Sequence, residues 1–265
     1  MTITVDHRPG HLGRPGASGR AGMLGLGYGV AACAVLLATF FYAIGFVDGL
    51  VVPKSIDTGA IWPPFVAFCI DIQLLCLFAI QHLGMARAGF RRWLAGHIAP
   101  IHVSPMVERS TYVLCTSLTL ILLFVAWQPL PAVVWQAANS FAATVIQSLS
   151  VLGWSIALHS IVLIGRFELF GVKQVVLNFA GRTENATRFR TPGLYGVVRH
   201  PIYLGFIIAL WAAPVMTAGH LLFAGMMTVC MFIGIWLEER ELLAFFGDRY
   251  RQYRERVAML LPGVF

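Results

Sequence analysis

Long uncharged apolar runs limit the fold of this chain more than any other feature. A helix needs roughly 20 residues to cross about 30 Å of hydrocarbon. Only 12% of the 265 residues are charged, against about 25% in an ordinary soluble domain. We therefore expect an all-α fold, a polytopic integral membrane helical bundle of five to six spans. The runs lie at residues 22–47, 62–84, 110–127, 142–165, 201–215 and 218–237.

The end of the bundle is expected to differ from the rest. The last two runs are short, and Pro214 and Gly219 lie where one gives way to the other. Because both residue types favour turns, we expect a helical hairpin here, followed by C-terminal helices on the cytoplasmic side. Residues 21–265 show no internal repeat and are interpreted as a single membrane domain. Residues 1–20 are rich in Gly, Pro and Arg without an apolar period, which predicts a disordered cytoplasmic arm.

The positive charges alternate between loops and so predict the orientation of the bundle. Arg is frequent in residues 1–20, in the 85–109 and 166–200 loops and in the C-terminal tail. The 48–61 loop has one Lys against two Asp, and the 128–141 loop has no charge. Loops rich in Lys and Arg stay in the cytoplasm, so both termini are expected there, most simply across a bacterial inner membrane. Since the net charge of +7 is confined to these loops, the lipid bilayer and a small molecule are the expected partners, and not nucleic acid.

The cysteines give no sign of a metal site or a disulfide framework. All five lie inside apolar runs and form no CxxC pair or other zinc-ligand spacing. We interpret them as small buried hydrophobic residues. They are Cys33, Cys69, Cys76, Cys115 and Cys230.

Charged and aromatic polar residues concentrate in two stretches, 191–205 and 238–256. Each lies at one end of the expected hairpin, on its cytoplasmic side, so the hairpin brings the two stretches together. Either stretch alone is explained as well by an interfacial turn or by a solvated helix face. Their joint occurrence favours a ligand-binding core at about residues 190–256.

The first stretch predicts the start of a helix. Pro201 suits the first helical position, so His200 falls at the cap, and Tyr203 follows within the first turn. Unpaired N–H groups at such a start can hold an anion such as a carboxylate.

The second stretch offers the complementary charge. Glu238 and Glu239 leave the last span as carboxylates that could hold an ammonium group. Beyond Gly247, where one helix is expected to stop and another to begin, further polar residues recur at helical spacing: Tyr250, Tyr253 and Arg254. A ligand with an amino-acid end, a planar base and a positive sulfur would find a partner for each part.

The order Arg-His-Pro-x-Tyr-x-Gly, a span, and then Glu-Glu-x-x-Leu-x-x-x-Phe-Gly-x-x-Tyr-x-x-Tyr resembles a known pattern. It is similar to the C-terminal core of the isoprenylcysteine carboxyl methyltransferase and phospholipid methyltransferase superfamily. The resemblance implies an integral-membrane fold that binds S-adenosyl-L-methionine in a cytoplasm-facing pocket, closed over by C-terminal helices. One departure is Ala258, where the superfamily often has a proline after the valine.

Further segments extend the likeness to almost the whole chain, which looks like the bacterial methanethiol S-methyltransferases. This narrower resemblance implies methylation of methanethiol, a small volatile thiol, to dimethyl sulfide. The segments are residues 41–46, 52–57, 81–87, 108–112 and 169–174. Together the two resemblances imply that the cofactor is bound by Gln174, Leu194, Tyr195, Arg199, His200, Pro201, Tyr203, Gly205, Glu238, Glu239, Tyr250, Tyr253 and Arg254.

Three upstream residues are candidates for the catalytic step. Methyl transfer from a sulfonium to sulfur requires mainly that the thiolate be formed and held in line with the methyl group. A base or a nearby positive charge favours the thiolate. His82, at the cytoplasmic end of the second span, could accept the proton, and Arg87 and Arg109 could supply positive potential. The alternative for His82 is a hydrogen-bonded packing residue.

Other functions stay open at this stage. Methylation of a prenylated cysteine or of a phospholipid headgroup by the same fold would need a wide tunnel to the bilayer. A haem-binding or nitric-oxide-related membrane protein is suggested by His82, His159, His200 and His220, although His220 is expected near the outer face and the inner histidines are not. A transporter is disfavoured, because no paired broken helices occur in matching halves.

Overall fold

A computed structural model describes residues 19–87, 89–90, 105–164 and 191–263. Within them, five helices are long and apolar enough to cross a membrane. The fold is therefore a polytopic helical membrane bundle, as expected. The helices are α1 (Gly19–Asp48), α2 (Pro64–Met85), α4 (Pro105–Ala126), α5 (Ser140–Ile164), η1 (Gly193–Gly196), α7 (Pro201–Trp211), α8 (Ala218–Phe246) and α9 (Asp248–Arg256); the strands are β1 (Val133–Gln136) and β2 (Val215–Thr217).

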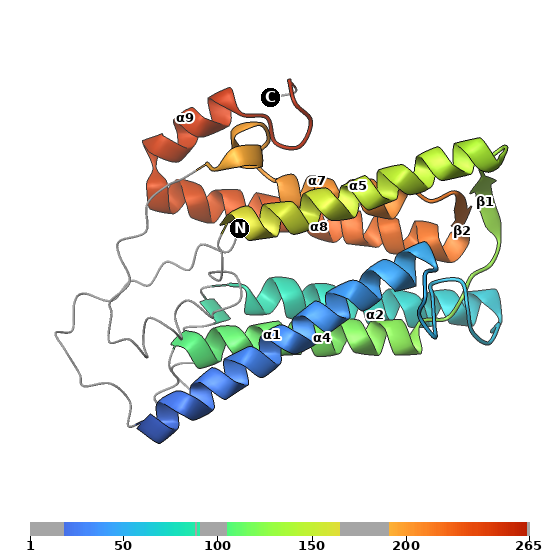
Figure 1. The fold of residues 1–265 in the computed structure, drawn as a ribbon, viewed down its shortest axis with the longest axis horizontal. Coiled ribbons are helices and arrows are strands. Elements are labelled where there is room, and N and C mark those ends of the chain that lie inside the picture. Colours follow the sequence, from blue (N-terminus) through green and yellow to red (C-terminus); the bar gives the residue numbers. More distant parts are fainter. Residues whose placement is uncertain (1–18, 88, 91–104, 165–190, 264–265) are drawn as a thin grey trace.

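The long helices form two layers (Figure 1). One layer contains α1, α2 and α4, and the other contains α5, α7 and α8, with α9 folded over one end. Aromatic rings join the layers: Phe46 of α1 packs against Phe223 of α8 with ring centroids 5.9 Å apart, and Phe40 packs against Trp154 of α5 at 5.8 Å. Dispersion contacts of this kind hold helices together where lipid removes the hydrophobic drive to associate.

The helices α5 and α7 pack closely, and glycines allow their approach. A Cβ atom at Gly205 would lie 2.5 Å from the backbone nitrogen of Ala157 and 2.6 Å from the carbonyl oxygen of Gly153. A Cβ atom at Gly153 would lie 2.5 Å from the backbone nitrogen of Ala209. The two backbones therefore touch directly, the arrangement that small residues permit in membrane helices.

The expected hairpin forms, but its two arms differ from the predicted runs. The first arm, α7, ends at Trp211 instead of reaching residue 215, and the second, α8, continues to Phe246. Residues 215–217 form β2, which pairs antiparallel with β1, Val133 opposite Thr217. This pairing satisfies backbone groups that a membrane-embedded turn would leave without partners. Glu238 and Glu239 thus lie within α8 and not beyond it.

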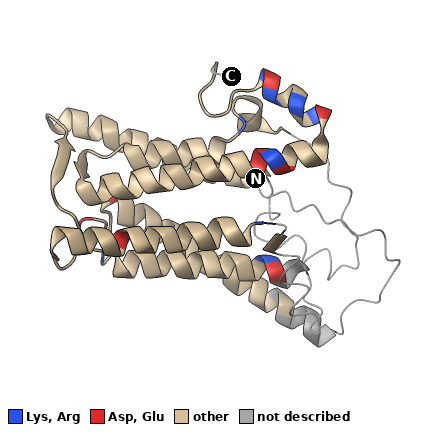
Figure 2. Ribbon diagram, turned by 180° about the vertical axis from the view of Figure 1, so that it is seen from behind, with Lys and Arg blue, Asp and Glu red and all other residues tan. Residues whose placement is uncertain are grey.

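The end of the bundle away from α9 is fastened by three aspartates. Asp48 accepts hydrogen bonds from the Ser150 hydroxyl (2.7 Å) and the Trp154 indole N–H (2.8 Å), which joins the end of α1 to α5. Asp57 accepts one from Thr217 (2.6 Å), and the buried Asp71 accepts one from the Gln128 backbone N–H (2.8 Å). Charged residues gather toward the two ends of the bundle (Figure 2).

Candidate active site

The start of α7, the end of α8 and α9 meet at one mouth of the bundle. Pro201 occupies the first turn of α7 and His200 its N-cap, as predicted. The chain after α9 returns along this start: the Arg199 N–H donates to the Ala258 carbonyl (2.8 Å) and the His200 N–H to the Met259 carbonyl (3.2 Å). The protein's own C-terminal segment therefore pairs with the backbone of the two residues that precede α7. Position 258 contributes its carbonyl, a group that a proline would also supply.

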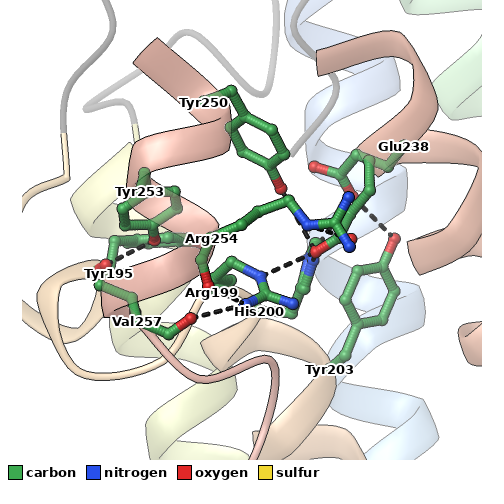
Figure 3. A network of polar contacts seen from close by, with 10 residues as sticks. Tyr195, Arg199, His200, Tyr203, Glu238, Tyr250, Tyr253, Arg254 and Val257 are labelled. Carbon is green, nitrogen blue, oxygen red and sulfur yellow. Dashed lines mark hydrogen bonds and ion pairs between the residues drawn. The ribbon is translucent and has the colours of Figure 1, made fainter. Parts of the chain in front are cut away.

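Glu239 is the centre of an ion-pair network at this mouth, and Figure 3 shows its partners Arg199, His200 and Arg254. Its Oε1 atom accepts from Arg199 Nε at 2.8 Å and lies 3.2 Å from His200 Nε2, and its Oε2 atom lies 3.3 Å from Arg254 Nε. The Tyr250 hydroxyl donates to Oε1 at 3.4 Å. Glu239 is only 8% exposed, so its charge is compensated by these groups and not by water. The partners of Glu239 are side chains of the protein, where the sequence suggested a ligand ammonium.

The same network fastens α9 over the mouth. Arg199 Nη1 donates to the carbonyl oxygens of Arg254 (3.1 Å) and Val257 (2.6 Å). The Tyr253 hydroxyl donates to the Tyr195 carbonyl at 2.6 Å. Burial raises the pKa of Tyr253 to about 12, so this hydroxyl keeps its proton and the bond persists across the physiological range. Gly247, with φ of +55°, makes the break between α8 and α9 that lets α9 turn back.

One side of the network offers polar groups to a ligand. The Tyr195 hydroxyl is buried and has no hydrogen-bond partner among the described residues. Burial and the Glu238 carboxylate raise the pKa of Tyr195, which keeps the hydroxyl a donor. Glu238 lies on the same side: its Oε2 atom accepts from the Tyr203 hydroxyl at 3.4 Å and lies 3.9 Å from His200 Nδ1.

A second polar group surrounds His82 on the other layer. The His82 Nδ1 atom lies 3.2 Å from the Tyr112 hydroxyl of α4 and 3.5 Å from the Thr116 hydroxyl, and the Phe78 ring stacks on the imidazole at 5.2 Å. Arg109 precedes Tyr112 by one turn and lies within its electrostatic reach. Arg87 also lies within electrostatic reach of Tyr112, so the three catalytic candidates surround this tyrosine, to which the sequence pattern assigned no role.

The remaining candidates occupy other positions. Arg87 forms an ion pair with Glu241 of α8 at 2.9 Å, at the exposed rim where α2 meets α8. Leu194 accepts the N–H groups of Val197 and Val198 with its carbonyl and so shapes η1. Gly205 lies at the contact with α5, where packing accounts for its small size. Gln174 falls in residues 165–190, outside the described part of the chain. In that described part, His, Cys, Asp and Glu form no group of three or more that could hold a metal ion.

Fold and site together define a polytopic helical membrane protein with a buried ion-pair network at the mouth of its final helices. The chain belongs to the methanethiol S-methyltransferase family. It is 52% identical to methanethiol S-methyltransferase 1 of Bradyrhizobium diazoefficiens over 89% of this chain and 81% of that protein. It is 46% identical to methanethiol S-methyltransferase of Mycobacterium tuberculosis over 89% and 94%.

More distant similarity is of two kinds. Nurim of Xenopus laevis is 32% identical over 58% of this chain and 55% of its own length. A family model described as a protein of unknown function (DUF1295) matches residues 101–257, which include the network around Glu239 and also Tyr112, but not His82. No solved structure matches the chain.

Proposed function

We propose that this protein methylates methanethiol to dimethyl sulfide with S-adenosyl-L-methionine as the methyl donor. The observation that carries the proposal is the identity of 41–52% over about nine-tenths of the chain to relatives that bear the name of this activity. The two polar groups of the structure supply what such a reaction needs, one for the donor and one for the acceptor.

The residues around Glu239 fit the donor. A methionine carboxylate needs cationic partners, which Arg199, His200 and Arg254 provide, and its ammonium needs a carboxylate such as Glu238. The buried Tyr195 hydroxyl is a further donor on the same side. We propose that these residues and their neighbours, Pro201, Tyr203, Tyr250 and Tyr253, hold the donor, whose sulfonium supplies an electrophilic methyl group when bound.

The residues around His82 fit the acceptor. His82 takes the S–H proton on Nε2, because Nδ1 faces the Tyr112 hydroxyl. Arg109, and more remotely Arg87, favour the thiolate by their positive charge. The sulfur then forms a bond to the methyl carbon as the carbon–sulfonium bond breaks, and dimethyl sulfide and the demethylated donor leave. His82, in this scheme, is the general base.

The histidines do not favour the haem alternative. His220 begins α8 and its Nε2 atom lies 2.9 Å from the Leu210 carbonyl. His200 contacts Glu239, nineteen residues further along the same helix, a distance of roughly 28 Å at 1.5 Å per residue. His82 is engaged by Tyr112 on another layer. His220 and His200 therefore do not form an axial pair.

The charges at the two ends of the bundle indicate how the protein is oriented in the membrane. Arginines of the described residues, such as Arg199 and Arg254, lie at the mouth with α9, and the opposite end carries Asp48, Asp57 and Lys54. We propose, from the retention of positive charge inside, that the mouth with α9 and both termini face the cytoplasm across a bacterial inner membrane.

The proposed activity is tested with membranes from cells that express the protein. They are incubated with methanethiol and a donor that carries a deuterated methyl group, and the headspace is analysed by gas chromatography with mass detection. Dimethyl sulfide with one deuterated methyl group is expected, and vector-only membranes are the control. Transfer to a prenylcysteine peptide or a phospholipid, without labelled dimethyl sulfide, would show that the fold serves another acceptor.

A further inference from the structure

The outer face of α2 carries a polar residue at a depth where lipid is expected. Gln73 is exposed and is the tenth of the 22 residues of this membrane-spanning helix. Exposed tryptophans, which favour the membrane interfaces, lie on either side of its level. Trp62 precedes α2, and Trp236 of α8 lies two residues beyond Gly234, which packs beside Leu83 of α2. Gln73 lies between Trp62 and Leu83 in the sequence, roughly 15 Å from each at 1.5 Å per residue.

The amide of Gln73 is not satisfied by the chain itself. Among the described residues, none forms a hydrogen bond with this side chain. Lipid tails offer neither a donor nor an acceptor, and a polar group without a partner in an apolar medium costs free energy. In membranes, Gln side chains typically form hydrogen bonds with a neighbouring helix. The position of Gln73 therefore indicates that another helix covers this face of α2.

The residues around Gln73 form a stripe with the spacing of a helix–helix seam. Its members are exposed or half-buried and recur at alternating intervals of three and four residues. Cys76 was expected to be buried and is instead exposed, as a part of this stripe. A single polar residue within such a seam fixes the register of the helices. The stripe consists of Val66, Cys69, Gln73, Cys76 and Ile80.

We propose that this stripe is the interface of a homodimer, in which the Gln73 amides of the two copies form hydrogen bonds with each other. An amide carries both donors and an acceptor, so two copies of one Gln satisfy each other. All copies of the chain share one orientation in the membrane, so the two-fold axis of the dimer lies along the membrane normal. Each residue of the stripe then lies close to its own copy. The inference does not depend on the proposed methylation, because it concerns the lipid-facing surface of α2.

The first test uses Cys76 as a reporter of this contact. A chain that retains Cys76 as its single cysteine is oxidised in membranes with copper phenanthroline. A disulfide-linked dimer is expected on a non-reducing gel, because Cys76 lies one turn from Gln73 beside the axis. The control has Leu122→Cys, an exposed position on α4, as its single cysteine and should stay monomeric. Equal linkage of the two chains, as random collision would give, or no linkage through Cys76, would overturn the inference.

The second test removes the amide. Gln73→Leu keeps an apolar side chain at the seam, and no described residue of the same chain loses a hydrogen bond, so the melting temperature should stay close to that of the parent. The dimer should dissociate about 3–20-fold more readily, measured by energy transfer between fluorescently labelled copies diluted in lipid vesicles. Gln73→Asn keeps an amide and should dissociate less readily than Gln73→Leu. If Gln73→Leu associates as tightly as the parent, Gln73 does not form the proposed contact.

Discussion

At the scale of the residue, Glu239 is the centre of an ion-pair network and also lies in the proposed donor site. It is nearly buried, and its carboxylate is shared by Arg199, His200 and Arg254. Breaking a buried ion pair by neutralising one partner typically destabilises a protein by about 3–5 kcal/mol, because the other charge stays buried without compensation. The role of this carboxylate can therefore be tested by stability and by donor binding together.

Glu239→Gln is expected to lower the melting temperature of the detergent-solubilised protein and to weaken donor binding in calorimetry at temperatures where the variant is folded. The lower melting temperature and the weaker donor binding have one cause, because Arg199 and His200 lose the negative charge that orients them. Glu255→Gln, an exposed change on α9, is the control and should alter neither. If Glu239→Gln keeps the melting temperature and the donor affinity of the parent, the ion-pair network is not part of the donor site.

His82 gives the second prediction at this scale, and its test is the dependence on pH. If His82 is the base, His82→Ala should lower turnover roughly 10²–10⁴-fold and leave donor affinity nearly intact. The loss should become smaller as pH rises, because solution hydroxide then forms the thiolate without help. A loss of the same size at every pH, with a lower melting temperature, would return His82 to a packing role beside Phe78 and Tyr112.

Local rules predicted part of this site and not the rest. The helix start at Pro201, the His200 cap and the break at Gly247 each depend on the conformational preference of one or two residues, and the structure confirms all three. The pairing of Glu239 with protein cations depends on the direction in which α9 turns back after Gly247. That direction is set by contacts between distant segments, such as Arg199 with Val257, and no periodicity in the sequence encodes it.

At the scale of the element, α5 packs against α7, the first arm of the hairpin, and so holds the start of α7 at the candidate site. The sequence predicted the long helices well, since their length is fixed by the thickness of the bilayer. It did not predict the β1–β2 pair, because strands of four and three residues leave no recognisable alternation. The sequence also did not indicate that Gly205 packs against α5, because its motif implied only a role in cofactor binding.

Gly205→Ala should therefore destabilise the fold. Its Cβ atom would meet the backbone of α5 at 2.5 Å, and backbone cannot move aside as a side chain can. Overpacking of this kind typically costs about 1–3 kcal/mol, which a thermal melt would detect. Gly84→Ala, where a Cβ meets nothing within 4 Å, is the control. If Gly205→Ala keeps its melting temperature but loses donor affinity, the cofactor role implied by the motif is the correct one.

At the scale of the whole molecule, the ends of the bundle define its orientation. On a background without the five native cysteines, Ala138→Cys in the loop after β1 should react with a membrane-impermeant maleimide in intact spheroplasts. Gln252→Cys on α9 should react only after lysis. Both positions are exposed in the structure, so access differs only through the membrane. The reverse pattern would invert the proposed orientation.

The division into two layers connects the enzyme to the mechanics of its membrane. The proposed donor side belongs to α7, α8 and α9, whereas His82 and Tyr112 belong to α2 and α4, and aromatic contacts such as Phe46 with Phe223 join the layers. An in-line transfer requires reacting atoms about 3–3.5 Å apart, so a small change in the tilt of one layer against the other changes the fraction of productive complexes. Bilayers that are too thick or too thin impose such tilts at fractions of a kcal/mol per Å. Turnover in reconstituted vesicles should pass through a maximum as the acyl chains are lengthened, with donor affinity nearly constant, and the acyl composition of a cell's membrane would then adjust how much dimethyl sulfide it releases.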